Sequence, residues 1–536
     1  MKPGKQSDRR WDWFEDDDEI RLLQNGKRGV LAIVFGRATI ILLLVLLEFG
    51  LIILAAHSLG EYSSAFYLLS RLLSVAVIFY LINTSGNPTQ KITWIVLIFA
   101  VPAVGLTLYL LVRLDLGHRA IKSRLQTIIA DTAPLCPQNT ELMKKLRTEA
   151  PGLRGLAAYA YRTASGNVYE NNAVRYYPSG EAKFEALLAD LEKAEHFIFL
   201  EYFIIDEGVM WGRVLKVLEK KVRAGVEVRV LYDGMCAFTR LPYRYPKELA
   251  ELGIRCKMFA PLRPLASTYY NNRDHRKIVV IDGRVGFTGG VNLADEYINV
   301  GSKLGHWKDT AVRIEGEAVR FLTLLFLQMW AVNERELEDF RPYLDACVPC
   351  ASPEPGYVLP YADSPLDEER VGETVYLNIL DRADRYVHIF TPYLILDDQM
   401  ITALTSAAKR GVDVQIILPH IPDKRYAFAL AKGHYRELLS AGVRIFEYTP
   451  GFVHAKVFVS DDIKAVVGTI NLDYRSLYLH FENAVCLYGV PAVADIEADF
   501  AETRARCQEI THDDWKTNPL VTRISAMLLK LFAPLM

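Results

Sequence analysis

Three long apolar runs lie in the N-terminal part of the chain. After them, short apolar stretches alternate with stretches whose apolar residues have the spacing of a helix. The runs at 38–56, 65–82 and 92–112 each contain 18 to 21 residues. That length lets a helix cross a hydrocarbon core of about 30 Å. The pattern therefore predicts an N-terminal transmembrane helical region over 38–112, preceded by a leader over 1–37.

Two charged residues interrupt these runs, Glu48 in the first and Arg71 in the second. A charge inside a membrane needs a partner or a protein-facing position, so we expect the two to pair. The alternative is that Arg71 reaches the interface and Glu48 is protonated. Lys and Arg are frequent in the leader and again after the third run, which favours a cytoplasmic position for both. Two spans plus an interfacial segment would satisfy this rule, whereas three spans would not. The sequence does not decide between two and three spans.

After residue 112 the pattern becomes that of an α/β protein, and it occurs twice. Residues 225–231 match 411–417, and residues 248–255 match 437–444. Repeats of this size predict two homologous α/β domains packed with pseudo-two-fold symmetry. The expected boundaries are a linker over 113–165, a first domain over 166–345, a second linker over 346–370 and a second domain over 371–536, which includes an apolar tail over 519–536.

The strongest sequence signal is a repeated motif. His-Arg-Lys-Ile-Val-Val-Ile-Asp at 275–282 recurs as His-Ala-Lys-Val-Phe-Val-Ser-Asp at 454–461, so both copies have the pattern HxKxxxxD. A Gly-small-x-Asn element follows each copy, at 289–292 and at 468–471, and the distance from His to Asn is 17 residues in both. Two matched copies inside a wider repeat indicate a functional site that is built twice.

The residue types in the motif suit chemistry at a phosphodiester. Side chains at i and i+2 of a strand share a face, so His275 and Lys277 point into one pocket, and His454 and Lys456 do the same. One imidazole can attack phosphorus, and the other can protonate the departing oxygen. The two lysines stabilise the equatorial oxygens. This reaction requires no metal and no cofactor.

Other motif residues have supporting parts. Glycines at the ends of the return strands let backbone N–H groups approach a phosphate closely, and asparagine amides can donate to its oxygens. The motif aspartates, Asp282 and Asp461, belong to the candidate catalytic set, but at hairpin turns we expect them to orient or pack the motif. The candidate phosphate-binding residues are Gly289, Gly290, Asn292, Gly468, Thr469 and Asn471.

These residues resemble the signature of the phospholipase D superfamily, HxKxxxxD followed by GSxN. Within it the chain is similar to the bacterial cardiolipin synthases over nearly its whole length, including Trp307-Lys-Asp-Thr310. The chain departs from the generic pattern at Gly290 and Thr469, where Ser is usual. Gly290 supplies no hydroxyl, so any hydrogen bond from that position is lost in the first half.

The resemblance implies a transphosphatidylation at the bacterial plasma membrane by a multi-pass protein. One phosphatidylglycerol gives its phosphatidyl group to an active-site histidine and releases glycerol; the head-group hydroxyl of a second phosphatidylglycerol then attacks to form cardiolipin. By analogy His275 is the nucleophile and His454 the acid/base, although the near symmetry leaves the reverse assignment open. A membrane-bound phospholipase D, which hydrolyses or exchanges head groups, would use the same residues.

The composition indicates which kinds of binding partner to expect. The formal net charge is −2, from 62 basic and 64 acidic residues, whereas nucleic-acid-binding proteins usually have a strong basic excess. Membrane lipid, and not nucleic acid, is therefore the expected partner, which disfavours a nuclease; the sequence does not tell whether the protein has a protein partner. A non-enzymatic scaffold would predict eroded motifs, yet both motifs are intact. The seven cysteines have no regular spacing and predict no disulfide framework.

Overall fold

The computed structural model describes residues 63–84, 86–113, 116–260, 272–367 and 369–516, with single positions near the C-terminus. The predicted leader, the first apolar run with Glu48, and nearly all of the C-terminal tail lie outside the described residues.

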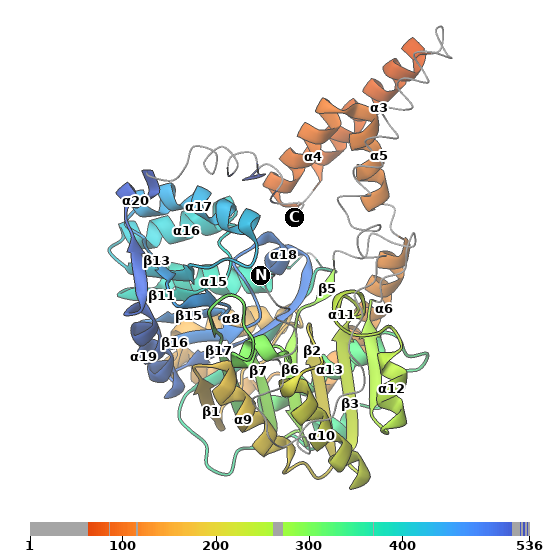
Figure 1. Cartoon of the computed structure of the whole chain (residues 1–536), viewed down its shortest axis with the longest axis vertical. Coiled ribbons are helices and arrows are strands. Elements are labelled where there is room, and N and C mark those ends of the chain that lie inside the picture. Colours follow the sequence, from red (N-terminus) through yellow and green to blue (C-terminus); the bar gives the residue numbers. More distant parts are fainter. Residues whose placement is uncertain are drawn as a thin grey trace, which may run out of the picture.

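Two mixed β-sheets with the same strand order form the body of the molecule (Figure 1). The first has the order β1-β9-β7-β6-β2-β3-β4 and the second β10-β17-β16-β15-β11-β12-β13-β18. In each sheet three neighbouring strands are parallel, β2-β3-β4 and β11-β12-β13. The first sheet consists of β1 (Asn172–Tyr177), β2 (Phe197–Tyr202), β3 (Glu227–Asp233), β4 (Arg255–Phe259), β6 (Lys277–Ile281), β7 (Val285–Gly289) and β9 (Ala311–Gly316). The second consists of β10 (Tyr357–Asp363), β11 (Tyr386–Phe390), β12 (Asp413–Pro419), β13 (Arg444–Tyr448), β15 (Val457–Ser460), β16 (Lys464–Gly468), β17 (His480–Tyr488) and β18 (Cys507–Ile510).

The matching strand orders confirm an α/β fold made of two related halves. Short buried runs form the central strands, for instance β6, in which all five residues are buried, as expected for strands covered on both faces. Helices flank the sheets: α9 (Gly180–Leu191), α10 (Val209–Arg223), α11 (Cys236–Thr239), α12 (Tyr245–Glu251), α14 (Arg341–Leu344), α15 (Val371–Arg382), α16 (Asp398–Lys409), α17 (Arg425–Ser440), α18 (Tyr474–Tyr478), α19 (Ala492–Arg504) and α20 (His512–Lys516).

One hydrophobic core extends across both halves. It joins Val280 and Val312 of the first sheet to Val457 and Val485 of the second. Helix α13 (Val319–Ala331) also lies in this core; 12 of its residues are buried, and Arg320 alone is partly exposed. A mainly apolar helix buried on nearly every side packs against neighbours all round, so α13 helps to hold the halves against each other.

Both ranges that the sequence favours as linkers contain regular structure. The range 113–165 forms α6 (Leu116–Thr132), α7 (Thr140–Glu149) and α8 (Pro151–Arg162). Leu146 and Leu156 of these helices pack into the core of the second half. The range 346–370 includes β10, an edge strand of the second sheet. The second half therefore takes helices from the chain that precedes the first.

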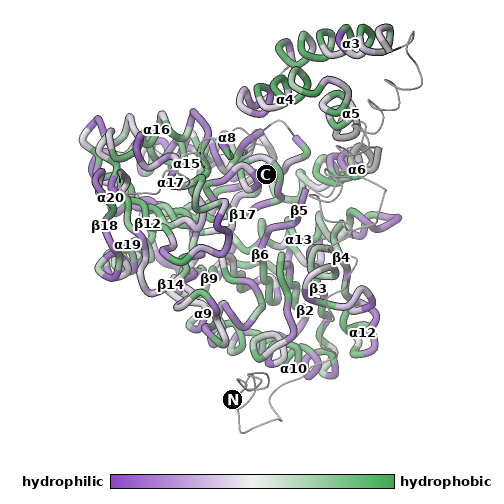
Figure 2. The backbone as a smooth tube through the Cα atoms, turned by 45° about the horizontal axis from the view of Figure 1, so that its top comes forward, coloured by the Kyte–Doolittle hydropathy of each residue, from purple (hydrophilic) through white to green (hydrophobic). Residues whose placement is uncertain are grey.

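Three helices project from the body: α3 (Ser63–Asn83), α4 (Pro88–Ala100) and α5 (Pro102–Arg113) (Figure 1). Figure 2 shows that hydrophobic positions dominate them. The apolar run 92–112 is divided between α4 and α5, because Pro102 begins a new helix directly after Val101. Within the described part of the chain, no helix combines the length and the apolar character that a membrane span needs.

Candidate active site

Each motif histidine stands just before a central strand, and the other half of the molecule holds its backbone. The N–H of His275 donates to the carbonyl of Phe481 at 2.9 Å, and the N–H of His454 donates to the carbonyl of Lys308 at 2.7 Å. Short parallel pairs support these contacts: β5 (Arg273–Asp274) with β17, and β14 (Gly451–Val453) with β8 (His306–Lys308). The two histidines are therefore fixed where the halves meet.

Each imidazole also binds a carboxylate from the opposite half. Nδ1 of His275 lies 2.9 Å from both oxygens of Glu482, and Nδ1 of His454 lies 2.7 Å from Oδ2 of Asp309. Both carboxylates are fully buried. A carboxylate acceptor keeps the proton on Nδ1, which leaves the lone pair of Nε2 free. Both rings are thus prepared to act as a base or a nucleophile through Nε2.

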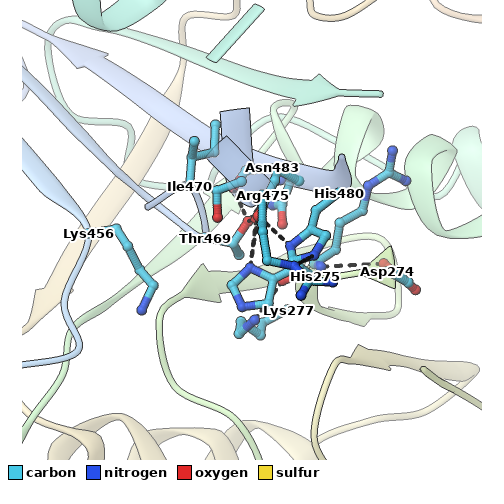
Figure 3. Close-up of polar contacts among 12 residues, drawn as sticks. Asp274, His275, Lys277, Lys456, Thr469, Ile470, Arg475, His480 and Asn483 are labelled. Carbon is cyan, nitrogen blue, oxygen red and sulfur yellow. Dashed lines mark hydrogen bonds and ion pairs between the residues drawn. The ribbon is translucent and has the colours of Figure 1, made fainter. Parts of the chain in front are cut away.

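The two motif lysines join the half-sites electrostatically. Nζ of Lys277 donates to the carbonyl of His275 at 2.6 Å, and Nζ of Lys456 lies 2.9 Å from Nδ1 of His454. Burial, helped by the positive charges of both lysines, holds the pKa of each histidine well below its usual value. Because each lysine acts on both rings, the structure brings all four side chains into one site. Figure 3 shows His275 with Lys277 beside it, and Lys456, which directly precedes β15 of the second half.

Three ionisable groups of the site, Lys277, Lys456 and Asp309, have pKa values close to neutrality. Burial lowers the pKa of Lys277 to about 7, although Glu482 acts in the opposite direction. Burial likewise lowers the pKa of Lys456 to about 8. It raises the pKa of Asp309 to about 7, against the effect of Lys456. Since an anionic phosphate favours the charged lysines, the site gains positive charge when such a ligand binds.

The motif asparagines differ from each other. Oδ1 of Asn292 accepts from the N–H of Ile204 at 3.0 Å, and its amide donates to the Tyr297 hydroxyl at 2.7 Å. One amide hydrogen of Asn292 therefore remains for a ligand. Asn471 is buried, and its Oδ1 has no hydrogen-bond partner among the described residues.

Three of the candidate phosphate-binding residues use their N–H groups within the backbone. The N–H of Gly290 donates to the carbonyl of Thr310 and that of Thr469 to the carbonyl of Asn483, both at 2.9 Å, while the N–H of Gly468 donates to the carbonyl of Lys456 at 3.3 Å. Phosphate binding by these three residues stays a prediction, and in this structure their N–H groups are already bonded.

The glycines instead allow close packing. A Cβ on Gly290 would lie 2.0 Å from Oδ1 of Asp309, and one on Gly468 would lie 2.2 Å from Cβ of Ala484. Gly289 has φ +149°, and a Cβ there would lie 2.4 Å from the carbonyl of Thr310.

The motif aspartates lie at the far ends of their strands, away from the histidines. The carboxylate of Asp282 accepts from the N–H groups of Glu195, His196 and Phe197, each at 2.8 Å. Asp461 accepts in the same way from three consecutive N–H groups, Asp384 to Tyr386, at 2.9 to 3.0 Å. Both aspartates also have positive φ values, 52° and 57°. They anchor each hairpin to the start of the neighbouring strand in the sheet, β2 or β11.

Comparison with known proteins identifies the family. A family described as "Cardiolipin synthase, PLD-like domain" matches residues 187–323 and 376–504, and one described as "Phospholipase_D-nuclease N-terminal" matches 72–113. A cardiolipin synthase of Geobacillus kaustophilus is 35% identical over 477 residues, which is 88% of this chain and 94% of that protein. The chain belongs to the cardiolipin synthase family. An uncharacterized protein of Streptococcus mutans is 49% identical over 86% of this chain and all of its own length.

A solved structure agrees with the fold of this cardiolipin synthase family member. Phosphatidylserine synthase from Haemophilus influenzae superposes with a TM-score of 0.52 at 15% sequence identity, covering 71% of this chain and 97% of that one. At that identity the likeness concerns the arrangement of the two halves alone.

Sequence reasoning missed the carboxylate partners, Asp309 and Glu482. The segment that contains Asp309 was part of the family resemblance, but no role was assigned to Asp309. Glu482 was not part of the resemblance and was assigned no role. A usable signal exists, because each acid follows the asparagine of its half, 17 residues after Asn292 and 11 after Asn471. Sequence reasoning also missed His480, whose ring centroid lies 5.5 Å from that of His275. Among the described residues, His275, His480 and Glu482 are the group whose ligand atoms could hold a metal ion.

Restoring the generic serine at Gly290 is expected to harm this family member. In Gly290→Ser the new Cβ would displace Asp309 and break its contact with His454, so activity should fall about 100-fold. Turnover of phosphatidylglycerol by purified protein measures the effect. Thr469→Ser, the matched change in the second half, keeps the hydroxyl that contacts Glu482 and should stay within about threefold of wild type. Equal behaviour of the two variants would contradict this account.

Removing the Asp282 anchor is expected to affect stability. Asp282→Ala leaves three backbone N–H groups without their acceptor, at a cost of about 3 kcal/mol or more. Thermal unfolding of the purified protein measures the loss. Asp462→Ala is the control: Asp462 follows Asp461 at the matching turn of the second half, is exposed, and makes its contacts with Arg385 and Tyr386 at the surface; a similar drop there would contradict the anchoring role.

Proposed function

We propose that this protein is a cardiolipin synthase that transfers a phosphatidyl group from one phosphatidylglycerol to another. The observation that carries the proposal is the pair of buried histidines. Nδ1 of each ring contacts a carboxylate, and the positive charges of Lys277 and Lys456 act on both rings. Family membership supports the same reaction.

In the first step Nε2 of His275 attacks phosphorus, and the bond from phosphorus to the glycerol oxygen breaks. His454 supplies the proton to that oxygen. The anionic phosphate offsets the lysine charges that depress the pKa of His454, and the Asp309 carboxylate stabilises the imidazolium. Lys277 and Lys456 hold the equatorial oxygens throughout.

In the second step neutral His454 takes the proton of the head-group hydroxyl of another phosphatidylglycerol. The freed oxygen attacks phosphorus, the phosphorus–nitrogen bond breaks, and His275 is regenerated with cardiolipin as the product. Protons balance over the cycle, because the one given to glycerol is replaced by the one taken from the acceptor.

The donor and the acceptor are both lipids, and the projecting helices fit a membrane location. Large apolar side chains are exposed on α3, α4 and α5, including Leu68, Leu72, Phe79, Phe99 and Leu110. Exposed apolar surface on this scale is typical of contact with lipid or another protein. We propose the bacterial plasma membrane as the location.

The decisive experiment supplies purified protein in detergent with phosphatidylglycerol alone and identifies the products. Cardiolipin and glycerol in equal amounts are expected. Phosphatidic acid and glycerol without cardiolipin would instead make water the acceptor and the protein a phospholipase D.

The pH profile of kcat/KM is expected to be narrow. As pH rises through about 7 and about 8, Lys277 and Lys456 lose the charges that bind phosphate, so the rate falls on the alkaline side. As pH falls below about 7, Asp309 gains a proton and no longer accepts from His454, so the rate falls on the acid side. Bound phosphate raises both lysine pKa values, and the alkaline limb of kcat should therefore lie at higher pH than that of kcat/KM. If the alkaline limbs of kcat and kcat/KM lie at the same pH, this assignment is contradicted.

A further inference from the structure

A third histidine lies beside the proposed nucleophile. His480 begins β17, is only 9% exposed, and its ring centroid lies 5.5 Å from that of His275. Figure 3 shows His480 close to both Arg475 and His275. The reaction proposed above does not use it.

The position of His480 has a counterpart in the first half. His480 precedes Glu482 by two residues, and Trp307 precedes Asp309 by two. The ring of Trp307 lies 5.5 Å from that of His454, the same separation as in the other half. Nε1 of Trp307 has no hydrogen-bond partner among the described residues. Trp307 therefore packs against its histidine and contributes no hydrogen bond to the carboxylate.

The hydrogen bond from Arg475 fixes the tautomer of His480. Nε of Arg475 donates to Nε2 of His480 at 3.3 Å, and a guanidinium is always a donor. Nε2 must accept, so the proton of the neutral ring sits on Nδ1. Burial lowers the pKa of His480 to about 3, which keeps the ring neutral at working pH.

The Nδ1–H of His480 faces the carboxylate that holds the nucleophile. Nδ1 lies 3.6 Å from Oε1 of Glu482, longer than a direct hydrogen bond, so the N–H acts on the carboxylate as a dipole. Such contacts tend to shorten when substrate binds. The groups facing His480 are Arg475 from α18, Glu482 from β17, and His275 and Phe203 from the first half.

We propose that His480 is a positioning residue for the nucleophile. It orients Glu482, and through Glu482 it holds the Nδ1–H tautomer of His275, whereas Trp307 provides only packing for His454. The proposal rests on the proposed function insofar as His275 is the nucleophile. The proposal also makes the two half-sites unequal, although their motifs match.

The proposal predicts which property of the side chain at position 480 matters. A donor at the position of Nδ1 should preserve the orientation of Glu482, whereas a ring without a donor should not.

The test compares His480→Phe, His480→Asn and Trp307→Phe by glycerol release from phosphatidylglycerol. Asparagine places an amide where Nδ1 stood, whereas phenylalanine keeps the ring without a donor. His480→Phe should release glycerol about 10-fold more slowly than wild type. His480→Asn should recover most of the rate. Trp307→Phe keeps an aromatic ring against His454 and should lose less than about threefold.

Two outcomes would overturn the proposal: a wild-type rate in His480→Phe, or equal losses in the Phe and Asn variants. Thermal unfolding of each variant separates a loss of fold from a loss of positioning, because a variant with wild-type stability cannot lose rate through unfolding. Glycerol release occurs with either acceptor, so the test remains valid even if the protein proves to be a hydrolase.

Discussion

His275→Ala is expected to abolish glycerol release, lowering the rate by at least about 10⁴-fold, since no other group can supply the attacking electron pair. His454→Ala should lose turnover to a similar extent but for a different reason. Without His454 the leaving oxygen is protonated slowly, and the acceptor hydroxyl has no base. The phosphatidyl-histidine that does form should therefore persist.

Trapping distinguishes the two variants. Protein incubated with radiolabelled phosphatidylglycerol and denatured should carry label in His454→Ala and none in His275→Ala. His388→Ala is the control, because this buried histidine also pairs with a carboxylate, Glu497, outside the site, and it should leave glycerol release near the wild-type level. Label in His275→Ala and none in His454→Ala would reverse the two roles.

Glu482→Gln and Asp309→Asn are each expected to lower turnover by about 10³- to 10⁴-fold while the protein stays folded. An amide in place of the carboxylate can donate to Nδ1, which favours the tautomer with its proton on Nε2. The attacking or accepting lone pair is then lost. A comparable neutralisation of a carboxylate behind a catalytic histidine costs about 10⁴ in kcat.

Glu497→Gln provides the matched control for these two variants. Glu497 binds Nδ1 of His388 at 2.9 Å, the same distance that Glu482 keeps to His275, yet it should change turnover by less than about threefold. Steady-state assays with phosphatidylglycerol, together with circular dichroism, measure both effects. Losses of less than 10-fold in Glu482→Gln would mean that the carboxylate does not set the tautomer.

The elements around the motif could be predicted from sequence because their signals are local. The run 277–282 predicts a strand and 285–289 its return, and the structure forms β6 at Lys277–Ile281 and β7 at Val285–Gly289. The repeat also predicted the two related halves. Alternation of apolar residues and turn-forming glycines carries this information within a few residues.

The contacts that complete the site could not be predicted in this way. Glu482 lies 207 residues from His275 in sequence, and no periodicity connects them. The same applies to α8, whose apolar face gives no sign that it packs on the second half. The bound N–H of Gly290 depends on where Thr310 lies, which becomes visible only once the sheet is assembled.

The exchange of side chains between the halves has a consequence for how such a site can change over time. Two identical subunits related by a two-fold axis could build the same reciprocal contacts, but any substitution would then appear on both sides at once. Fusing the copies in a single gene removes that restriction. The contrast between Trp307 and His480, and between Gly290 and Thr469, marks where this chain has used that freedom.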